Sequence, residues 1–342
     1  MSKRNMINSD GLFVSTRVRL ARNIERLPFK TKNPSAFEEV ANTIKRAFPG
    51  TFGWVYIAHT KHEEAQALYE QHLISRELLE NETNGMIVNK TKPMTEDDRS
   101  QVCIMLGEED HIRIQVINVG LDLQSAHATA KQISDAISRE HPIARDPELG
   151  YLTSCPTNLG TAMRASVMMF LPALSISGAM ASIVRELAAH KITVRGVYGE
   201  GSKSSGHMYQ ISNQATMHLT EAQILKKVND AAQMLAKREV AAQAEWFTSA
   251  PDTIIDRVYR AFGILTHAHK ISSDEAMDLL AWLKLGDCLS ILRFKPRALD
   301  DLFFVTKPAT LITQNERSSD ILTRDKMRAK KIATVLRSNR MK

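Results

Sequence analysis

Some strand-like segments in this chain follow one another through short turns, within a mixed order of strands and helices that extends to about residue 247. The clearest example is the pair Gln101–Leu106 and Ile112–Ile117, which a short polar turn joins. Strands joined by hairpin turns pair antiparallel, so the order favours an α+β fold over residues 13–247, with an antiparallel sheet flanked by helices. We expect other strands at 53–58, 84–89, 150–154, 192–197 and 208–213, and helices at 35–48, 62–80, 121–140, 178–190 and 220–245.

Beyond the string Ala250-Pro251-Asp252 the chain carries helical patterns only. Proline is common at the first position of a helix, so this string predicts a boundary. Apolar residues recur at helical spacing over 252–263 and 287–305, and a last, basic helix is expected from about residue 318. The pattern predicts an all-helical C-terminal module over residues 251–342.

The charge of the chain favours an anionic ligand. The formal net charge is +7, and the last 20 residues are strongly basic, which fits ATP, a phosphoprotein or nucleic acid. Cys103, Cys155 and Cys288 lie far apart, without metal-type spacing or a disulfide framework, and suit a reducing compartment. The sequence begins without the apolar core of a signal peptide and holds no apolar run of membrane length, so we expect a cytoplasmic protein and no membrane partner.

The stretch Gly150–Ser166 gathers a thiol, two loop glycines and an arginine, and an apolar run over residues 165–174 follows. That run predicts a buried helix. Backbone N–H groups at the start of such a helix and the Arg164 guanidinium would point at the same anion. Cys155 beside this positive charge would tend toward the thiolate. A strand–turn–helix with a merely buried cysteine remains the alternative.

Three further segments carry charges that suit phosphate chemistry. In the strand-like segment over 12–23, Arg17 and Arg19 would face the same side and could clamp a polyanion, although a solvated basic edge would look similar. The three acids in the turn Gly107–Arg113 could hold a proton, order a cation or grip a guanidinium, or form a solvated acidic turn. The Gly/Ser-rich loop over 195–206 resembles a lid over phosphates or a plain hairpin loop.

Together these segments resemble the phosphagen (guanidino) kinase family, and specifically its bacterial protein arginine kinase branch. The matching motifs are STRVRLARN at 15–23, HLIS at 72–75, GEEDHIRIQ at 107–115, GYLTSCPTNLGTAMRASVM at 150–168 and RGVYGEGS at 195–202. Eukaryotic creatine and arginine kinases have a helical domain before the sheet domain. Here the extra helices come after it, as in the bacterial branch.

The resemblance implies transfer of the γ-phosphoryl group of MgATP to a guanidinium nitrogen. Guanidinium is a poor nucleophile, so a carboxylate must orient it and help to remove a proton. The resemblance implies Glu109 as the base, Asp110 in support, Glu200 as a second carboxylate on the lid, and Cys155 beside the guanidinium. It implies Mg²⁺ bound through ATP and no metal site made by the protein. The residues that it assigns to ATP are Ser15, Thr16, Arg17, Val18, Arg19, His72, Arg113, Arg164, Ala165, Ser166, Val167, Met168, Arg195, Gly196, Val197, Tyr198, Gly199 and Glu200. A lone histidine on the edge of an apolar stripe, as His72 is, is also often a packed core residue.

Three features depart from the family pattern. Gly107 stands where the family has Asn, and Ala162 where it commonly has Gly, while the lid continues with the polar string SKSSGH. None of these changes removes a named catalytic group. Gly107 could loosen the acidic turn, which would affect the rate rather than the type of reaction.

The C-terminal string RDKMRA matches the RDxxRA signature of this branch. It implies an allosteric phosphoarginine site made by Arg324, Asp325, Arg328 and Ala329. The two arginines are four residues apart on a helix and would pincer a phosphate, while Asp325 grips the guanidinium; a solvated basic helix end is the alternative. Exposed apolar residues on the helices over 252–305 would supply a homodimer interface.

The resemblance implies a protein arginine kinase that marks proteins for regulated proteolysis in a stress response. Its partners would be arginine-containing protein substrates, a zinc-finger activator protein and a Clp-type protease. A phosphagen kinase for a free small guanidine and a non-catalytic phosphoarginine-binding adaptor are the alternatives. The specificity loop for free guanidines belongs to the N-terminal domain of the eukaryotic enzymes, which has no counterpart in this sequence. We expect no direct nucleic-acid binding, because no aromatic platform accompanies the basic tail.

Overall fold

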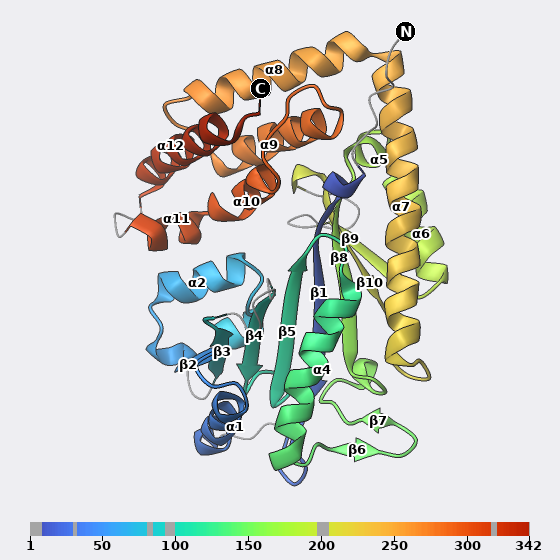
Figure 1. Ribbon diagram of the computed structural model, residues 1–342, viewed down its shortest axis with the longest axis vertical. Coiled ribbons are helices and arrows are strands. Elements are labelled where there is room, and N and C mark those ends of the chain that lie inside the picture. Colours follow the sequence, from blue (N-terminus) through green and yellow to red (C-terminus); the bar gives the residue numbers. More distant parts are fainter. Residues whose placement is uncertain are drawn as a thin grey trace.

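An eight-stranded sheet organises the first part of the chain in the computed structural model (Figure 1). The structure describes residues 9–29, 33–80, 85–92, 100–196, 205–315 and 320–341. Every neighbouring pair of strands is antiparallel, so the predicted α+β class is confirmed. In order across the sheet the strands are β2 Phe52–Tyr56, β3 Met86–Lys90, β4 Gln101–Leu106, β5 Ile112–Val119, β1 Phe13–Arg22, β8 Met163–Phe170, β10 Met208–Asn213 and β9 Ile192–Gly196.

The helices fall into two groups along the chain, and a two-stranded ribbon of β6 Arg145–Asp146 and β7 Gly150–Tyr151 stands apart from the main sheet. The helices around the sheet are α1 Pro34–Ala47, α2 His62–Glu70, α3 Arg76–Leu79, α4 Leu123–Glu140, α5 Pro172–Ile176, α6 Met180–Ala189 and α7 Glu221–Ser249. The helices that follow are α8 Pro251–His267, α9 Ser273–Cys288, α10 Ala298–Val305, α11 Pro308–Asn315 and α12 Ile321–Asn339. No helix in the described part of the chain combines the length and the apolarity needed to cross a membrane.

The central strand β1 divides its side chains between two faces. Val14, Val18 and Leu20 belong to the main hydrophobic core, and α4 packs against both β1 and β5. Because successive side chains of a strand point to opposite faces, Arg17 and Arg19 lie on the face away from that core. The predicted strand and its two-residue alternation are confirmed.

The face that carries these arginines is only partly covered. A small second core packs the α2–α3 segment, through residues such as Leu73 and Leu78, against Ile87 of β3 and Cys103 and Met105 of β4. These strand residues alternate with those of the main core, so α2 and α3 lie on the opposite face from α4. The same face of β5, β1, β8 and β10 is left for the site described below.

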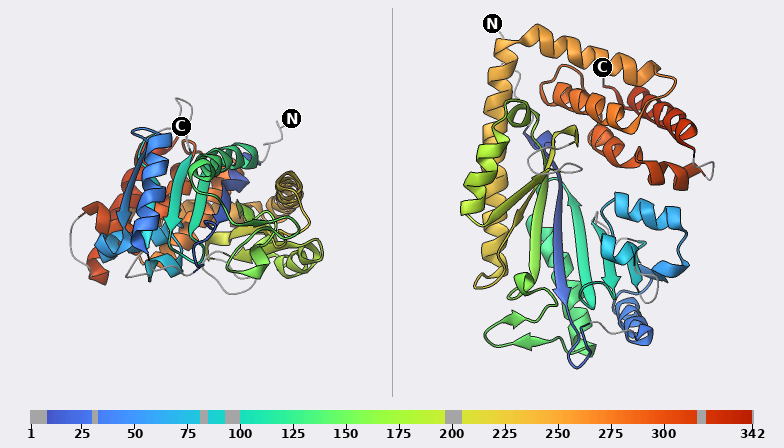
Figure 2. Two further views of the ribbon diagram at one scale, coloured as in Figure 1. Left: turned by 90° about the horizontal axis from the view of Figure 1, so that it is seen from below. Right: turned by 180° about the vertical axis from the view of Figure 1, so that it is seen from behind.

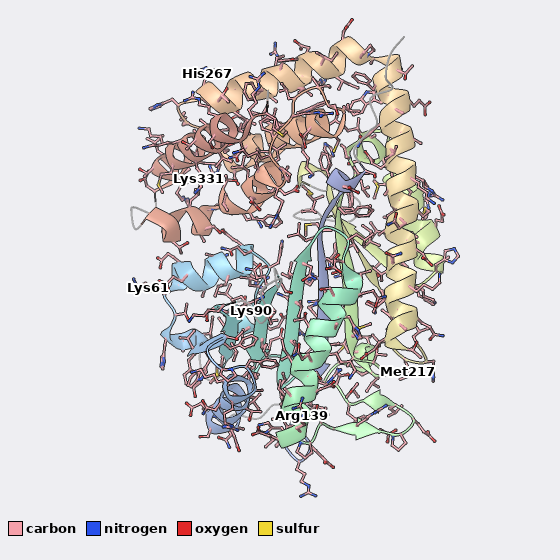
Figure 3. The ribbon with its side chains drawn as sticks, in the orientation of Figure 1. Lys61, Lys90, Arg139, Met217, His267 and Lys331 are labelled. Atoms are coloured by element: carbon pink, nitrogen blue, oxygen red, sulfur yellow. The ribbon has the colours of Figure 1, made fainter. Side chains whose placement is uncertain are left out.

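The C-terminal helices contact the sheet part of the molecule at two places. One is made by α9, which packs against the short helical turns at Asp10–Leu12 and Ser205–His207. The other is made by α11, which packs beside α2 (Figures 1 and 2). In Figure 3, Lys61 at the start of α2 and Lys331 on α12 lie on the two sides of this contact. The Glu70 carboxylate accepts hydrogen bonds from the Ala309 and Thr310 N–H groups at 3.0 and 3.1 Å, and Lys307 Nζ donates to the Glu70 carbonyl oxygen. A single residue at the end of α2 therefore caps the start of α11.

Four of the expected elements are wrong in type or length. Of the strand expected over 150–154, only Gly150–Tyr151 forms a strand, β7, and it lies outside the main sheet. The apolar run over 165–174 lies largely in strand β8, between β1 and β10, and not in a helix. Apart from Ser166, the residues of β8 in this run are apolar on both faces of the strand, so they give nearly the same unbroken apolar pattern as a buried helix. The helix expected over 62–80 ends at Glu70, and the one expected over 287–305 begins only at Ala298. His72 and Arg297, with φ of 59° and 69°, adopt left-handed backbone that is incompatible with a continuous helix.

Glu70→Ala tests the contact between α2 and α11. Removing the carboxylate leaves the two N–H groups of α11 without their acceptor, so we expect the free energy of unfolding to fall by about 1–3 kcal/mol. Glu39→Ala is the matched control, because Glu39 is exposed in the middle of α1. Chemical denaturation of both variants measures the difference. An equal loss in the two variants would contradict a stabilising role for Glu70.

Candidate active site

The sheet register brings the predicted arginines together. Directly opposite residues of antiparallel strands share a face, and Arg19 of β1 stands opposite Arg164 of β8. Arg17 lies two residues before Arg19, and Arg113 of β5 stands opposite Ala21, two residues after it. In the same way Arg195, opposite Gln210 of β10, falls on this face. The face thus presents five guanidinium groups: Arg17, Arg19, Arg113, Arg164 and Arg195.

These arginines repel one another in a poorly solvated place. Burial, followed by the charges of Arg164 and Arg113, lowers the pKa of Arg17 to about 10. Burial and three neighbouring arginines also lower the pKa of Arg19 well below its usual value. Arg164 donates to Ser212 Oγ at 3.0 Å, but its Nε is buried and meets no acceptor among the described residues. A bound polyanion would relieve the repulsion and supply the missing acceptor.

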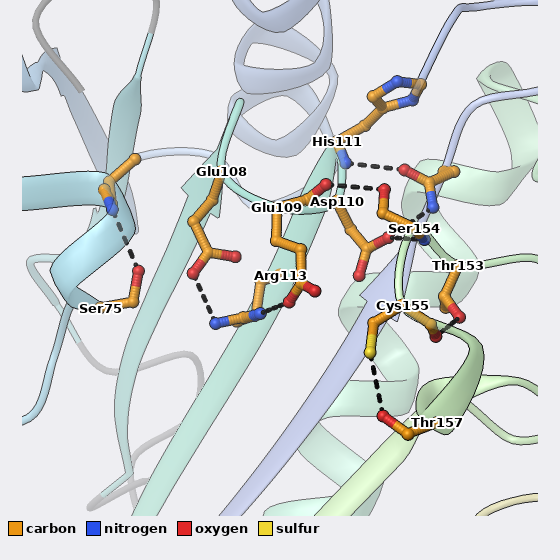
Figure 4. A network of polar contacts seen from close by, with 12 residues as sticks. Ser75, Glu108, Glu109, Asp110, His111, Arg113, Thr153, Ser154, Cys155 and Thr157 are labelled. Atoms are coloured by element: carbon orange, nitrogen blue, oxygen red, sulfur yellow. Dashed lines mark hydrogen bonds and ion pairs between the residues drawn. The ribbon is translucent and has the colours of Figure 1, made fainter. Parts of the chain in front are cut away.

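The acidic turn at one end of this face holds Arg113 between two carboxylates (Figure 4). Arg113 donates to Glu108 Oε1 at 2.5 Å and to Glu109 Oε2 at 3.0 Å. The Glu108 side chain is fully buried, and burial raises its pKa against the lowering effect of the Arg113 charge. The Glu109 side chain is 38% exposed, so Glu109 is the carboxylate of this pair that a substrate can reach.

Asp110 has a different place from its neighbours. Its side chain is buried, and Oδ1 accepts hydrogen bonds from Asn23 Nδ2 at 2.7 Å and from the Ser154 N–H at 2.8 Å. Ser154 Oγ also donates to the Glu109 carbonyl oxygen (Figure 4). Asp110 therefore fixes the acidic turn to the Cys155 loop. No individual role was predicted for Asn23, Ser154 or Glu108 from the sequence, although all three lie within the matched motifs.

Cys155 precedes a single 3₁₀ turn, Pro156–Asn158, and the chain then enters strand β8 and not an α-helix. Cys155 is partly exposed, and its Sγ lies 3.0 Å from Thr157 Oγ1. Gly160, at φ 98°, lies so close to the backbone of Thr216 that a Cβ would come within 2.5 Å of the Thr216 carbonyl oxygen. The predicted anion site at a helix N-terminus is therefore wrong, while Arg164 itself faces the arginine cluster from a strand.

The backbone conformation at Gly107 and Ala162 bears on the two departures from the family pattern at these positions. Gly107 has φ 72°, a backbone region that both Gly and Asn adopt, and its N–H donates to the His111 carbonyl oxygen at 3.0 Å. Glycine is thus compatible with the acidic turn. Ala162 has φ 48°, where a Cβ carries a cost, and it is buried. The structure gives no sign that either residue displaces a named side chain.

The remaining residues assigned to ATP fall into three groups. Ser15, Ser166 and Met168 line a cavity with Arg17 and His72. The side chains of Val18, Ala165 and Val167 belong to the core on the other face, and Thr16 Oγ1 donates to the Gly120 carbonyl oxygen at 2.7 Å, so these residues can meet ATP only through their backbone. Gly196 ends β9. Val197, Tyr198, Gly199 and Glu200 lie outside the described residues.

The RDKMRA segment lies on α12, but its second arginine is not solvated. Arg328 is 2% exposed and donates to the carbonyl oxygens of Thr306 and Ile271 at 2.9 and 2.8 Å and to Asp325 Oδ1 at 2.5 Å. Ala329 is buried and Arg324 is half-buried. The alternative of a solvated basic helix end is therefore wrong for Arg328. Asp325, expected to grip a guanidinium, grips that of Arg328.

No cluster of three or more His, Cys, Asp or Glu side chains suited to a metal ion occurs among the described residues. The arginine face, by contrast, fits a nucleoside triphosphate. It offers several charged donors in fixed strand positions, and the buried Arg164 Nε meets no acceptor among the described residues.

Comparison with known proteins decides the family. The model of the ATP:guanido phosphotransferase C-terminal catalytic domain matches residues 36–242. The chain belongs to this family. A second model, the protein-arginine kinase McsB C-terminal domain, matches residues 251–342. The protein-arginine kinase of Caldanaerobacter subterraneus subsp. tengcongensis is 38% identical over 94% of this chain and 96% of its own length. That of Symbiobacterium thermophilum is 37% identical over 93% and 91%.

Two solved kinase structures share the fold. A duplicated taurocyamine kinase from Schistosoma mansoni, with bound transition state analog components, matches with a TM-score of 0.59 and 24% identity, over 76% of this chain and 38% of that one. A lombricine kinase matches with a TM-score of 0.57 and 22% identity, over 71% and 70%. At this level of identity the likeness concerns the fold alone.

His72 allows a test of the electrostatics at this site. Burial, followed by the charges of Lys307, Arg17 and Arg19, lowers its pKa to about 3. As the pH falls from about 6.5 toward 3, the unfolded chain takes up a proton that the folded protein excludes. The free energy of unfolding is therefore higher above this pH range than within it. Because of His72, acidification through the range lowers that free energy by at most about 1.4 kcal/mol per pH unit.

His72→Asn should flatten the fall in the free energy of unfolding between pH 6.5 and 4.5, because asparagine tolerates left-handed backbone and does not titrate. Chemical denaturation at several pH values measures the slopes. His269→Asn, at an exposed position, should retain the wild-type slope. Equal slopes for wild type and His72→Asn would show that His72 takes up its proton equally well in both states.

Proposed function

We propose that this protein transfers the γ-phosphoryl group of ATP to the guanidinium of arginine side chains in proteins. The observation that carries the proposal is the meeting of five arginines on one sheet face with the reachable carboxylate of Glu109. The matches to relatives named protein-arginine kinase, together with the C-terminal domain model of that name, favour a protein substrate.

The geometry gives Glu109 and Arg113 linked parts in this reaction. Arg113 holds Glu109 through Oε2 at 3.0 Å, and the same guanidinium faces the arginine cluster. Glu109 would orient the incoming guanidinium and accept a proton from its attacking nitrogen. Glu108 keeps Arg113 in place from its buried side. Glu200, outside the described residues, would hold the other edge of the guanidinium, and Cys155 would lie against it.

The arginines would bind the triphosphate and stabilise the charge on the transferring phosphoryl group. That charge spreads over the phosphoryl oxygens, so fixed cations lower the barrier through placement. Arg17, Arg19 and Arg164 come from two adjacent strands, which fixes their spacing before ATP arrives. Mg²⁺, carried on the ATP phosphates, would neutralise part of the same charge.

Two other functions would use some of the same residues. A phosphagen kinase for a free guanidine would need the same catalytic face, and it is disfavoured by the near full-length matches to protein-arginine kinases. A phosphoarginine-binding adaptor would need the RDKMRA site alone and would leave Glu109 and the arginine face without a task. We keep phosphoarginine binding at Arg324, Asp325, Arg328 and Ala329 as a separate proposal beside catalysis.

We further propose a homodimer and a role in marking proteins for proteolysis. Exposed apolar residues on two neighbouring C-terminal helices support a docking surface for a second copy; they are Tyr259 and Ile264 on α8 and Ile321 and Leu322 on α12. A zinc-finger activator, a Clp-type protease and a cytoplasmic location are proposed from family resemblance. Residues 13–247 and 251–342 are the proposed domains.

Glu109→Gln tests the proposed reaction. The amide retains the shape of the side chain but cannot accept the proton, so we expect phosphoarginine formation to fall by about a hundredfold or more. The measurement is mass spectrometry of a model protein incubated with enzyme and MgATP, under conditions that preserve acid-labile phosphoramidates. Glu148→Gln, at an exposed loop position, is the matched control and should retain activity.

The reaction on free arginine separates the alternatives. Phosphorylation of free arginine without phosphorylation of protein would move the assignment to a phosphagen kinase. Full activity of Glu109→Gln on protein would contradict the role of this carboxylate. Binding of phosphoarginine peptides by a chain that phosphorylates neither substrate would leave an adaptor.

A further inference from the structure

A cavity of about 280 Å³ lies where the arginine face meets the C-terminal helices. Its sheet side includes Ser15 and Arg17 of β1, Ile117 of β5 and Met168 of β8, and His72 contributes from the end of α2. The opposite wall comes from the C-terminal module, through Arg297, through Asp300, Asp301, Phe304 and Val305 of α10, and through Thr310 of α11. Figure 1 shows α10 and α11 above the sheet, on the side of β5.

The cavity lies at the opposite end of the arginine face from the acidic turn. Along β1, Ala21 stands opposite Arg113 near the turn, while Ser15 stands opposite Val119 at the cavity. Six residues of strand separate the two positions, or roughly 20 Å. Arg17 and Arg19 lie between them. A triphosphate held by these arginines, with its γ-phosphate toward Glu109, would direct its nucleoside into the cavity.

The walls of the cavity suit a purine nucleoside. Ile117 and Met168 on one side and Phe304 and Val305 on the other are apolar and could enclose a flat ring. Asp301 offers a carboxylate for two ribose hydroxyl groups. Its side chain is 58% exposed and only loosely paired with Arg297, at 3.6 Å. Asp300, by contrast, is paired with the buried Lys284, which holds α10 in place.

We propose that α10 forms one wall of the nucleoside site, with Phe304 packing on the purine and Asp301 binding the ribose diol. The proposal rests on the proposed function, because it assumes that ATP lies on the arginine face. It goes beyond that function in assigning nucleotide recognition to the C-terminal module. ATP would then contact both parts of the chain and hold α10 against the sheet.

Phe304→Ala and Asp301→Asn test the two contacts. Binding of ATP, 2′-deoxy-ATP and inorganic tripolyphosphate is measured by calorimetry on the full chain. Loss of a base–aromatic contact should weaken ATP binding by about tenfold or more in Phe304→Ala, while tripolyphosphate binding stays as in wild type. Asp301→Asn should bind ATP several-fold more weakly and should lose the preference for ATP over its 2′-deoxy analogue.

Each variant has a matched control. Asp256→Asn removes another exposed aspartate that pairs with an arginine four residues away on a helix, and Phe247→Ala truncates another partly buried phenylalanine. Neither residue lines the cavity. Both controls should bind all three compounds as wild type does. Thermal unfolding of each variant separates a binding defect from a loss of folding; if Phe304→Ala unfolds, Phe304→Leu, which keeps apolar bulk without the aromatic face, takes its place.

The outcomes distinguish this inference from the proposed function. Wild-type affinity for ATP in both Phe304→Ala and Asp301→Asn would overturn the role of α10 and leave the catalytic proposal intact. Equal weakening of ATP and tripolyphosphate would also overturn it, because the loss would then lie at the phosphates. Failure of the wild-type chain to bind either compound would reject the nucleotide site as a whole.

Discussion

Repulsion among like charges on one face of the sheet is the constraint on which the rest of this site depends. Arg17, Arg19 and Arg164 are held in adjacent strands, and burial together with neighbouring positive charge lowers the pKa of each. Folding alone gains nothing from such an arrangement. The sheet core on the other face must stabilise it, and a multiply charged anion must complete it. In the proposed function, part of the stability of the fold thus serves to hold a phosphate site in place before ATP binds.

The acidic turn works because its three acids have different surroundings. Glu108 is buried against Arg113, Asp110 is buried against Asn23 and the Ser154 N–H, and Glu109 alone remains accessible. Glu108 positions the Arg113 guanidinium and Asp110 fixes the Cys155 loop, while Glu109 is the carboxylate available to the proposed substrate. A run of three acids that looks repulsive in the sequence therefore separates into three tasks once each side chain has its own partners.

Local periodicity was sufficient to predict the strand that carries Arg17 and Arg19 and the hairpin around the acids, because both patterns depend on adjacent residues. It failed for the run over 165–174, since the residues of β8 there are apolar on both faces of the strand apart from Ser166, and the pattern does not reveal a period of two. It also could not predict that Arg328 donates to the backbone carbonyl groups of Thr306 and Ile271, which lie far away in the chain. Sequence motifs identified the charged groups, but long-range packing decided which are accessible.

The position of Arg328 limits how the proposed phosphoarginine site on the C-terminal helices could work. Its guanidinium already joins α12 to the end of α10 through the Thr306 carbonyl oxygen, and the next residue, Lys307, bonds to Glu70 at the end of α2. A phosphate that drew Arg328 outward would have to replace these bonds or leave buried carbonyl groups unpaired. A ligand that used only the remaining guanidinium nitrogen would keep them. Binding that keeps the hydrogen bonds of Arg328 costs less free energy. Arg324, which is half-buried one turn away on the same helix, is then the arginine that can more easily move toward the ligand.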